Sequence, residues 1–349
     1  MKKFVYVGCR TTRERNARGK GLKVYQVLDD ENWKEVQTLY DEKNPSYQCI
    51  DKTGKYLYSV HGDSDFVSAF KINLEEGILT HINTIEGVGK NPVFITVDNT
   101  NEFLYAASLQ GGQISVIKRN LDGGISFPIF SERLCGKTDE SVSLAHQCLW
   151  DKNMKFLFVP AQGRGVGFGE INVFKKQEDG SLISTDCVFT REVDEPRHLA
   201  IHNNNRFLYC VNEKGNSVTF YIFDEGKGKL TPKQIVPSLP ETYVGEGQAS
   251  AIIISMDGKY LYQSNRIHDS ITVYSIDEKT GYIKAIANVS CLGKTPRFMT
   301  LNPEGTELVV ANEDSDDIRI FKLNNQGIPE YSGKVIFTES PVCITFGYF

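Results

Sequence analysis

The chain has 349 residues, of which 40% are hydrophobic and 24% are charged, a composition that suits a folded protein with a sizeable core and excludes a disordered tail or a fibre. The 39 basic and 44 acidic residues give a net charge of −5, so the chain lacks the excess of cations that a nucleic-acid backbone or an anionic bilayer attracts. We therefore expect no nucleic-acid partner and no membrane association.

The start of the chain combines two lysines with an apolar run that is too short for a secretory signal. No later segment approaches the roughly 20 apolar residues of a membrane-spanning helix, so we expect a cytoplasmic protein. Eight cysteines are scattered without any Cys-x-x-Cys pair, most of them in apolar runs. This pattern predicts buried, reduced thiols and not disulfides or metal ligands.

Three short strands are predicted near the start, at 4–7, 22–27 and 33–37. A repeated phrase follows, in which a turn residue precedes a strand that contains Leu beside an aromatic or apolar residue. Its six copies end 47 to 53 residues apart and are Gly54–Tyr58, Asn101–Tyr105, Met154–Phe158, Asn205–Tyr209, Gly258–Tyr262 and Gly305–Val309. A fixed period of this length indicates a repeat architecture.

Each copy belongs to a set of four predicted strands. One strand, such as Gln147–Trp150, precedes the copy, an alternating strand such as Val218–Tyr221 follows it, and a Gly turn then leads to a short fourth strand. No helical period of 3.6 residues competes with this pattern. Four strands in about 50 residues are typical of a propeller blade.

The two ends of the chain predict how the ring of blades closes. The N-terminal segment supplies only three strands, whereas Pro341–Phe346 has the character of a lone first strand. We therefore predict an all-β, seven-bladed β-propeller, a single domain over residues 1–349 whose ring is closed when the C-terminal strand completes the N-terminal blade. Two β-sandwich domains would need a linker, and the segments 118–143 and 235–247 are interpreted instead as long blade-to-blade loops over one face.

In such a blade, the start of the innermost strand and the end of the second strand lie on the same face, beside the axis. We expect the side chains at these positions to line one cleft: Asn44–Ser46 and His61, Asn91–Pro92 and Gln110, His146 and Gln162–Arg164, Arg197–His198 and Asn212–Glu213, Gln248–Ser250 and Asn265–Arg266, and Arg297 with Asn312–Glu313. The glycine-rich segment Gly163–Gly169 lies between two strands, so it is interpreted as a flexible loop over this cleft and not as a nucleotide site.

Three phrases at these positions carry a resemblance to a known family: Pro196-Arg-His198 with Asn212-Glu213, Ser264-Asn-Arg266 with Asp269–Tyr274, and Thr295-Pro-Arg-Phe298 with Asn302–Gly305. From Tyr6–Gly8 to Pro341–Cys343 the chain resembles the seven-bladed lactonase family, which holds propeller-type 6-phosphogluconolactonases and carboxymuconate cyclases. The resemblance implies an active site made of His146, Arg197, Glu213 and Arg266.

These residue types suit the opening or closing of a lactone ring. His146 and Glu213 are candidates for the proton donor or acceptor. Arg197 and Arg266 are candidates for holding an anionic substrate and the negative charge that develops on it. The further candidate substrate-binding residues are Arg297, His198, Gln162 and Asn265.

We therefore expect an enzyme that hydrolyses the ring of a sugar lactone or phospholactone without a cofactor or metal, takes a small anionic substrate, and is a monomer or a weak homo-oligomer. Two alternatives stay open: a muconate-type lactonizing cycloisomerase, and a non-catalytic propeller that binds a protein or carbohydrate on the same face. Ala251 and Ile253 stand where the family tends to carry polar residues, which leaves room for a different lactone or an unsaturated diacid.

Overall fold

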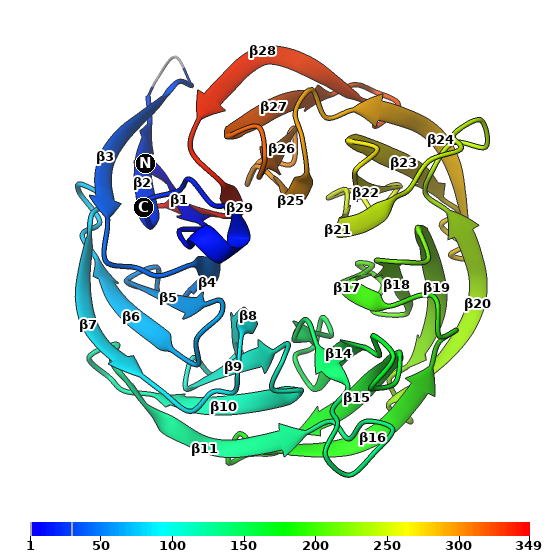
Figure 1. Ribbon diagram of the computed structural model, residues 1–349, viewed down its shortest axis with the longest axis horizontal. Helices are drawn as coiled ribbons and strands as arrows, with labels where there is room; N and C mark the ends of the chain where they lie inside the picture. The colour runs from blue at the N-terminus through cyan, green and yellow to red at the C-terminus, as the bar shows by residue number, and fades with distance from the viewer. Residues whose placement is uncertain (1, 29–30) are drawn as a thin grey trace.

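The computed structural model describes residues 2–28 and 31–349, and these residues form seven antiparallel sheets arranged as blades around a central axis (Figure 1). The described residues contain no α-helix and only one short 3-10 helix, η1 (Arg13–Arg15). No helix among them is long and apolar enough to cross a bilayer. The predicted fold class, an all-β seven-bladed propeller, is confirmed.

We number the blades in chain order and describe their strands from the axis outward. The strands are β29 (Pro341–Tyr348), β1 (Lys3–Cys9), β2 (Leu22–Val27) and β3 (Trp33–Leu39) in blade 1; β4 (Pro45–Ile50), β5 (Tyr56–His61), β6 (Val67–Ile72) and β7 (Leu79–Ile85) in blade 2; β8 (Pro92–Val97), β9 (Phe103–Ser108), β10 (Gln113–Arg119) and β11 (Ile125–Arg133) in blade 3; β12 (Leu144–Ala145) with β13 (Leu149–Trp150), β14 (Phe156–Gln162), β15 (Glu170–Lys176) and β16 (Leu182–Phe189) in blade 4; β17 (Pro196–Ile201), β18 (Phe207–Asn212), β19 (Ser217–Asp224) and β20 (Lys229–Pro237) in blade 5; β21 (Gln248–Ile254), β22 (Tyr260–Arg266), β23 (Ser270–Ile276) and β24 (Ile283–Ser290) in blade 6; and β25 (Pro296–Leu301), β26 (Glu307–Asn312), β27 (Asp317–Leu323) and β28 (Pro329–Phe337) in blade 7.

Blade 1 joins the two ends of the chain. Strand β29 pairs antiparallel with β1, from Lys3 opposite Tyr348 to Cys9 opposite Pro341. Beyond the strands, the backbone groups of Lys2 and Phe349 exchange hydrogen bonds of 2.7 and 2.9 Å. The predicted closure by the C-terminal strand is confirmed, and it removes an open edge between the first and last blades.

In blades 1, 2, 3 and 5, a tyrosine on the second strand bonds to the following blade. The hydroxyl of Tyr58 on β5 donates a hydrogen bond of 3.0 Å to the carbonyl of Gly123 in the following blade. Tyr6, Tyr105 and Tyr209 make the same contact with Gly77, Gly180 and Gly281, at 2.8 to 2.9 Å. These four glycines have positive φ angles of 73 to 86°, which glycine adopts at little cost. The tyrosine and the Gly turn of the sequence repeat are therefore two halves of one inter-blade contact.

Three sequence interpretations need correction. The inner strand of blade 4 was expected to run on from Gln147, but it is broken into β12 and β13 around His146. The segment 118–143 is not one long loop, because it contains the outer strand β11. All eight cysteines are free, but Cys135 and Cys187 are exposed. The latter lies on β16, an outer strand with one face toward solvent.

Candidate active site

Four inner strands begin with the same backbone pattern, a residue of positive φ followed by a proline. Asn44, Asn91, Glu195 and Thr295 have positive φ angles of 40 to 59°, and each is followed by a proline that starts β4, β8, β17 or β25. One residue after the proline, the pairing with the second strand shifts by a β-bulge. The bulged residues are Ser46, Val93, Arg197 and Arg297, and all four line one cavity near the axis. Bulges of this kind re-aim a side chain, so the phrase Pro-Arg carries its arginine into the axial cavity.

The axial cavity is narrow. It is lined by Arg10, Ser46, Tyr47, Val93, His146, Arg197, His198, Arg297, Phe298 and Val342, and its volume of about 20 Å³ is room for one water molecule. Tyr47 and Phe298 also line a wider cavity of about 660 Å³ toward the opposite face. The ring of Tyr47 lies 4.0 Å from Phe94 and 6.0 Å from Phe298, between centroids. Tyr47 and Phe298 therefore lie between the axial cavity and the wider one.

Glu213 is the centre of the first charged cluster. Its carboxylate lies 3.1 Å from Nε of Arg197 and 3.2 Å from Nη2 of Arg266. It also accepts hydrogen bonds from Nε2 of Gln162 at 3.2 Å and of Gln248 at 3.0 Å. Burial by itself would raise the pKa of Glu213, but the charges of Arg266 and Arg197 outweigh burial and lower the pKa to about 2. Glu213 is therefore ionised throughout the physiological pH range.

The two buried arginines of this cluster are held by backbone carbonyls of β21. Nη1 of Arg197 donates to the carbonyl of Ser250 at 2.8 Å, and Nη2 of Arg266 donates to that of Ala249 at 3.1 Å. Burial and the charge of Arg266 lower the pKa of Arg197, and burial lowers the pKa of Arg266 to about 10. Both guanidinium groups remain protonated. Together with the half-exposed Arg164, which lies 3.5 Å from Glu213, they give the cluster an excess of positive charge.

Two histidines lie beside these charges. The rings of His146 and His198 meet edge to face with centroids 5.1 Å apart. Nδ1 of His146 and Nε2 of His198 are buried and have no hydrogen-bond partner within residues 2–28 and 31–349. Burial, followed by the charge of Arg197, lowers the pKa of both rings well below the usual 6.5. Both imidazoles are therefore neutral at neutral pH, with ring nitrogens available to a bound molecule.

A second charged cluster lies in blades 7 and 1, which follow blade 6 around the ring. Glu313 contacts Nε of Arg10 at 2.9 Å and Nη1 of Arg297 at 3.2 Å. Glu313 and Arg297 were among the predicted cleft positions, but Arg10 was missed. The same rule would have found it, because Arg10 follows the end of β1, the second strand of blade 1.

Asn265 is the one candidate residue that neither lines the axial cavity nor contacts Glu213. It is fully buried, and its Nδ2 donates to Ser270 and Thr272 of the next strand, at 3.1 and 3.0 Å. Asn212 and Asn312 occupy the same position in their blades and also bond the start of the third strand. This repeated asparagine therefore shapes the turn, and the residue after it, such as Arg266 or Glu213, belongs to the charged clusters.

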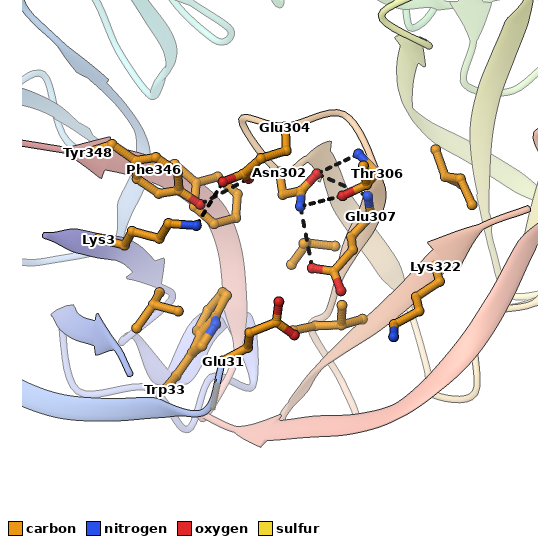
Figure 2. A pocket seen from close by; sticks show the side chains of 14 residues that line it. Lys3, Glu31, Trp33, Asn302, Glu304, Thr306, Glu307, Lys322, Phe346 and Tyr348 are labelled. Carbon is orange, nitrogen blue, oxygen red and sulfur yellow. Dashed lines mark hydrogen bonds and ion pairs between the residues drawn. The ribbon is translucent and has the colours of Figure 1, made fainter. Parts of the chain in front are cut away.

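A larger cavity of about 420 Å³ lies at the opposite end of the strands, between blades 1 and 7 (Figure 2). Figure 2 shows that Glu304 in this cavity is already paired, because it accepts from Lys3 at 2.8 Å and from the hydroxyl of Tyr348 at 3.4 Å. None of the predicted site residues lines it. Its size alone does not make it the functional site, and the axial cavity remains the candidate.

Comparisons with known proteins agree with this geometry. Residues 4–346 match the family model described as a seven-bladed β-propeller lactonase. A 6-phosphogluconolactonase of Bacillus subtilis is 28% identical over 172 residues, which is 49% of each chain, and one of Formosa agariphila is 30% identical over 297 residues, 80% of this chain and 81% of that protein. The matches to Bacillus subtilis and Lactococcus lactis proteins span about half the length of those relatives.

Solved structures superpose over nearly the whole chain. A protein of Bacteroides fragilis has a TM-score of 0.86 at 25% identity, with 99% of this chain and 98% of that chain covered. The periplasmic gluconolactonase of Pseudomonas aeruginosa has a TM-score of 0.88 at 21% identity, with 100% of this chain and 99% of that chain covered. At that identity the second likeness concerns the fold alone.

Proposed function

The chain belongs to the seven-bladed β-propeller lactonase family, and from this premise we propose that it hydrolyses the ring of a sugar lactone, with or without a phosphate, and needs no cofactor for this step. One observation carries the proposal: a neutral histidine and buried arginines in excess over carboxylates meet at one axial cavity. The relatives named 6-phosphogluconolactonase support the choice of reaction.

Lactone hydrolysis needs a base for water and a cation for the oxyanion. In the proposed reaction, His146 accepts a proton as water attacks the ring carbonyl and returns it to the ring oxygen as the C–O bond breaks, so that a hydroxy acid leaves. Arg197 and Arg266 stabilise the negative charge that develops on the carbonyl oxygen. The proton transfer is assigned to His146 because Glu213 has a pKa of about 2 and its contacts orient the arginines.

The four candidate substrate-binding residues take different proposed roles according to where they lie. Arg297 and His198 line the cavity and are proposed to touch the substrate. Gln162 donates a hydrogen bond to Glu213 and is proposed to position that carboxylate. Asn265 is proposed to hold the turn that presents Arg266.

The test is proton release from freshly generated 6-phosphogluconolactone and from glucono-δ-lactone. We expect fast hydrolysis by the wild type and a loss of about 100- to 1000-fold in kcat for Arg266→Ala, as for a lost oxyanion donor. A matched control is Glu192→Gln, which changes a carboxylate that is 75% exposed and does not line the axial cavity, and this variant should leave the rate unchanged.

Each other outcome points to a named alternative. No hydrolysis, together with loss of the diene ultraviolet absorbance of an added muconate, would replace the proposal with a cycloisomerase. Neither reaction, together with a melting temperature that small anions do not shift, would favour a protein- or carbohydrate-binding propeller. Wild-type turnover by Arg266→Ala would refute the assigned site.

A further inference from the structure

In blades 2, 3 and 5, the residue before the proline of the inner strand holds a loop of the preceding blade. In blades 2 and 3 this residue is an asparagine, and its Oδ1 accepts a hydrogen bond from a backbone N–H: Asn44 from Thr11 at 2.7 Å, and Asn91 from Asp63 at 3.0 Å. Thr11 and Asp63 each lie in the loop between the second and third strands of their blade. Asparagine suits this position, because it tolerates a positive φ and has a short polar side chain.

Blade 5 carries a glutamate at the same position. Oε1 of Glu195 accepts a hydrogen bond of 2.7 Å from the backbone N–H of Arg164, in the loop between β14 and β15 of blade 4. Glu195 has a φ of 53° and is only 7% exposed, and its Oε2 has no hydrogen-bond partner in the described part of the chain. A buried carboxylate with an unused oxygen, on a strained backbone, costs more than an asparagine would. Local costs of this kind are concentrated at functional sites.

The main chain of Glu195 joins three parts of the candidate active site. Its carbonyl accepts hydrogen bonds from the N–H of Glu213 at 2.8 Å and from Nε2 of Gln162 at 3.4 Å. Two residues further along the chain, Arg197 forms the bulge that directs its side chain into the axial cavity. Glu195 therefore lies where the ends of β14 and β18 meet the start of β17.

The loop Gly163–Gly169 brings one charged side chain to the site. Four of its seven residues are glycines, and glycine leaves the backbone many accessible conformations. Arg164 reaches from this loop to Glu213, at a distance of 3.5 Å. The place of this guanidinium group therefore depends on the contact that holds the backbone of Arg164.

The charges around Glu195 favour the same contact. Burial raises the pKa of Glu195, and the N–H groups of Arg164 and Gly163 and the charge of Arg164 oppose burial only in part. The charge of Glu213 raises the pKa of Glu195 further. Arg164 attracts both carboxylates, so it reduces the repulsion between them.

Arg164 also acts on the proposed base. Burial lowers the pKa of His146, and the charges of Arg197, Arg164 and Arg297 lower it further. The only other titratable ring against His146 among the described residues is that of His198, which is neutral. Each positive charge beside the imidazole disfavours its protonation. A displaced Arg164 would therefore make His146 easier to protonate.

We propose that Glu195 is a positioning residue: its carboxylate holds the Gly163–Gly169 loop so that Arg164 contacts Glu213 beside the proposed base His146. This inference rests on the proposed function. Glu195 does not line the axial cavity, and it takes no part in the proton transfer. Its effect on the reaction passes through the charge of Arg164.

The experiment uses Glu195→Gly, because glycine adopts a positive φ at little cost and only the side chain is lost. The rate constant kcat/KM for glucono-δ-lactone is followed from pH 4 to 8. We expect the acid limb of kcat/KM to move upward by about one pH unit, since a positive charge leaves the neighbourhood of the histidine. Arg164→Gln should give the same shift, and the double variant should add nothing to it. Leu292→Gly, at an exposed residue with a φ of 55° that does not line the axial cavity, is the matched control and should keep the wild-type profile.

Amide hydrogen exchange gives a readout that does not depend on activity. The N–H of Arg164 should exchange about 10-fold faster in Glu195→Gly than in the wild type, as expected when a hydrogen bond to a charged group is lost. The exchange of the amides in β14 should stay unchanged. Should Glu195→Gly not fold, Arg164→Gln carries the pH test, because that side chain is 46% exposed.

Three results would overturn the proposal: an unchanged pH profile in Glu195→Gly or, in its place, Arg164→Gln, shifts of the two single variants that add up in the double variant, and equal exchange of the Arg164 amide with and without Glu195. Additive shifts would make Glu195 a purely structural residue. If the wild type hydrolyses no lactone, the proposed function fails, and exchange alone decides whether Glu195 holds the loop. Faster exchange in Glu195→Gly would then support this hold, and equal exchange would refute it.

Discussion

Replacing Glu213 by Gln removes the carboxylate that contacts Arg164, Arg197 and Arg266. The variant keeps the size of the side chain but leaves the buried Arg197 and Arg266 without the carboxylate that contacts them. We expect the free energy of unfolding to fall, since breaking a buried ion pair by removing one partner is strongly destabilising, by about 3–5 kcal/mol.

The pKa of Glu213 gives an independent magnitude. A fall from the usual 4.5 to about 2 in the folded protein corresponds to about 3 kcal/mol, at about 1.4 kcal/mol per pKa unit. The folded-state pKa is depressed, so this stabilisation is complete above pH 4.5 and is lost as pH falls through about 2. At pH 3, roughly half of it, about 1.4 kcal/mol, should remain.

Urea denaturation of the wild type and of Glu213→Gln, at pH 7 and at pH 3, measures these values. The difference in unfolding free energy between the two proteins should be about 3 kcal/mol at pH 7 and about half as large at pH 3. Glu192→Gln, at a carboxylate that is 75% exposed, should stay within about 0.5 kcal/mol of the wild type. Equal stability of Glu213→Gln and the wild type at pH 7 would refute the reasoning, as would a difference that does not shrink on acidification.

Three further predictions use simpler assays. Because the pKa of His146 is lowered well below 6.5 and the neutral ring is the base, kcat/KM for a lactone should not fall between pH 8 and 6.5. A decline in kcat/KM centred near pH 6.5 would contradict the assignment. His146→Gln should lower kcat/KM by about 100- to 10,000-fold at any of these pH values. Asn265→Ala removes hydrogen bonds to Ser270 and Thr272 and should lower the unfolding free energy by about 1–3 kcal/mol without changing KM. A large rise in KM at unchanged stability would instead place Asn265 in contact with the substrate. In the native protein, a thiol reagent should modify Cys135 faster than the other exposed cysteine, Cys187, because burial and Glu170 raise the pKa of Cys187 to about 12. Peptide mapping after labelling measures the two rates, and faster labelling of Cys187 would contradict this prediction.

The architecture was accessible from the sequence because its determinants are local. Period-2 alternation and Gly turns specify strands and their ends within a few residues, and six copies of one phrase reveal the repeat. The closing strand was recognisable because Pro341–Phe346 resembles the inner strands and no partner strands follow it. The break in the inner strand at His146 could not be recognised from the sequence, because the run from Gln147 to Trp150 has the pattern of a regular strand.

The location of the site could be predicted from the sequence, but only some of its residues could. The rule that strand ends of one kind share a face brought together His146, Arg197 and Glu213, and the resemblance to a family gave them roles. The strand-end rule could not tell which of Asn265 and Arg266 belongs to the site. Neighbouring residues on a strand point to opposite sides, and the register decides which of the two faces the axis. Arg10 was missed because the rule was not applied to the blade that holds both chain ends.

By itself, the sequence determined the repeat, the number of blades and the face that carries the polar residues, because each follows from patterns a few residues long. Only the tertiary structure decided the rest. The bulges after Pro196 and Pro296 turn arginines toward the axis, and burial beside charges from other blades sets the pKa values of Glu213 and His146. These properties depend on distances between residues far apart in the chain, and such distances exist only once the ring has closed.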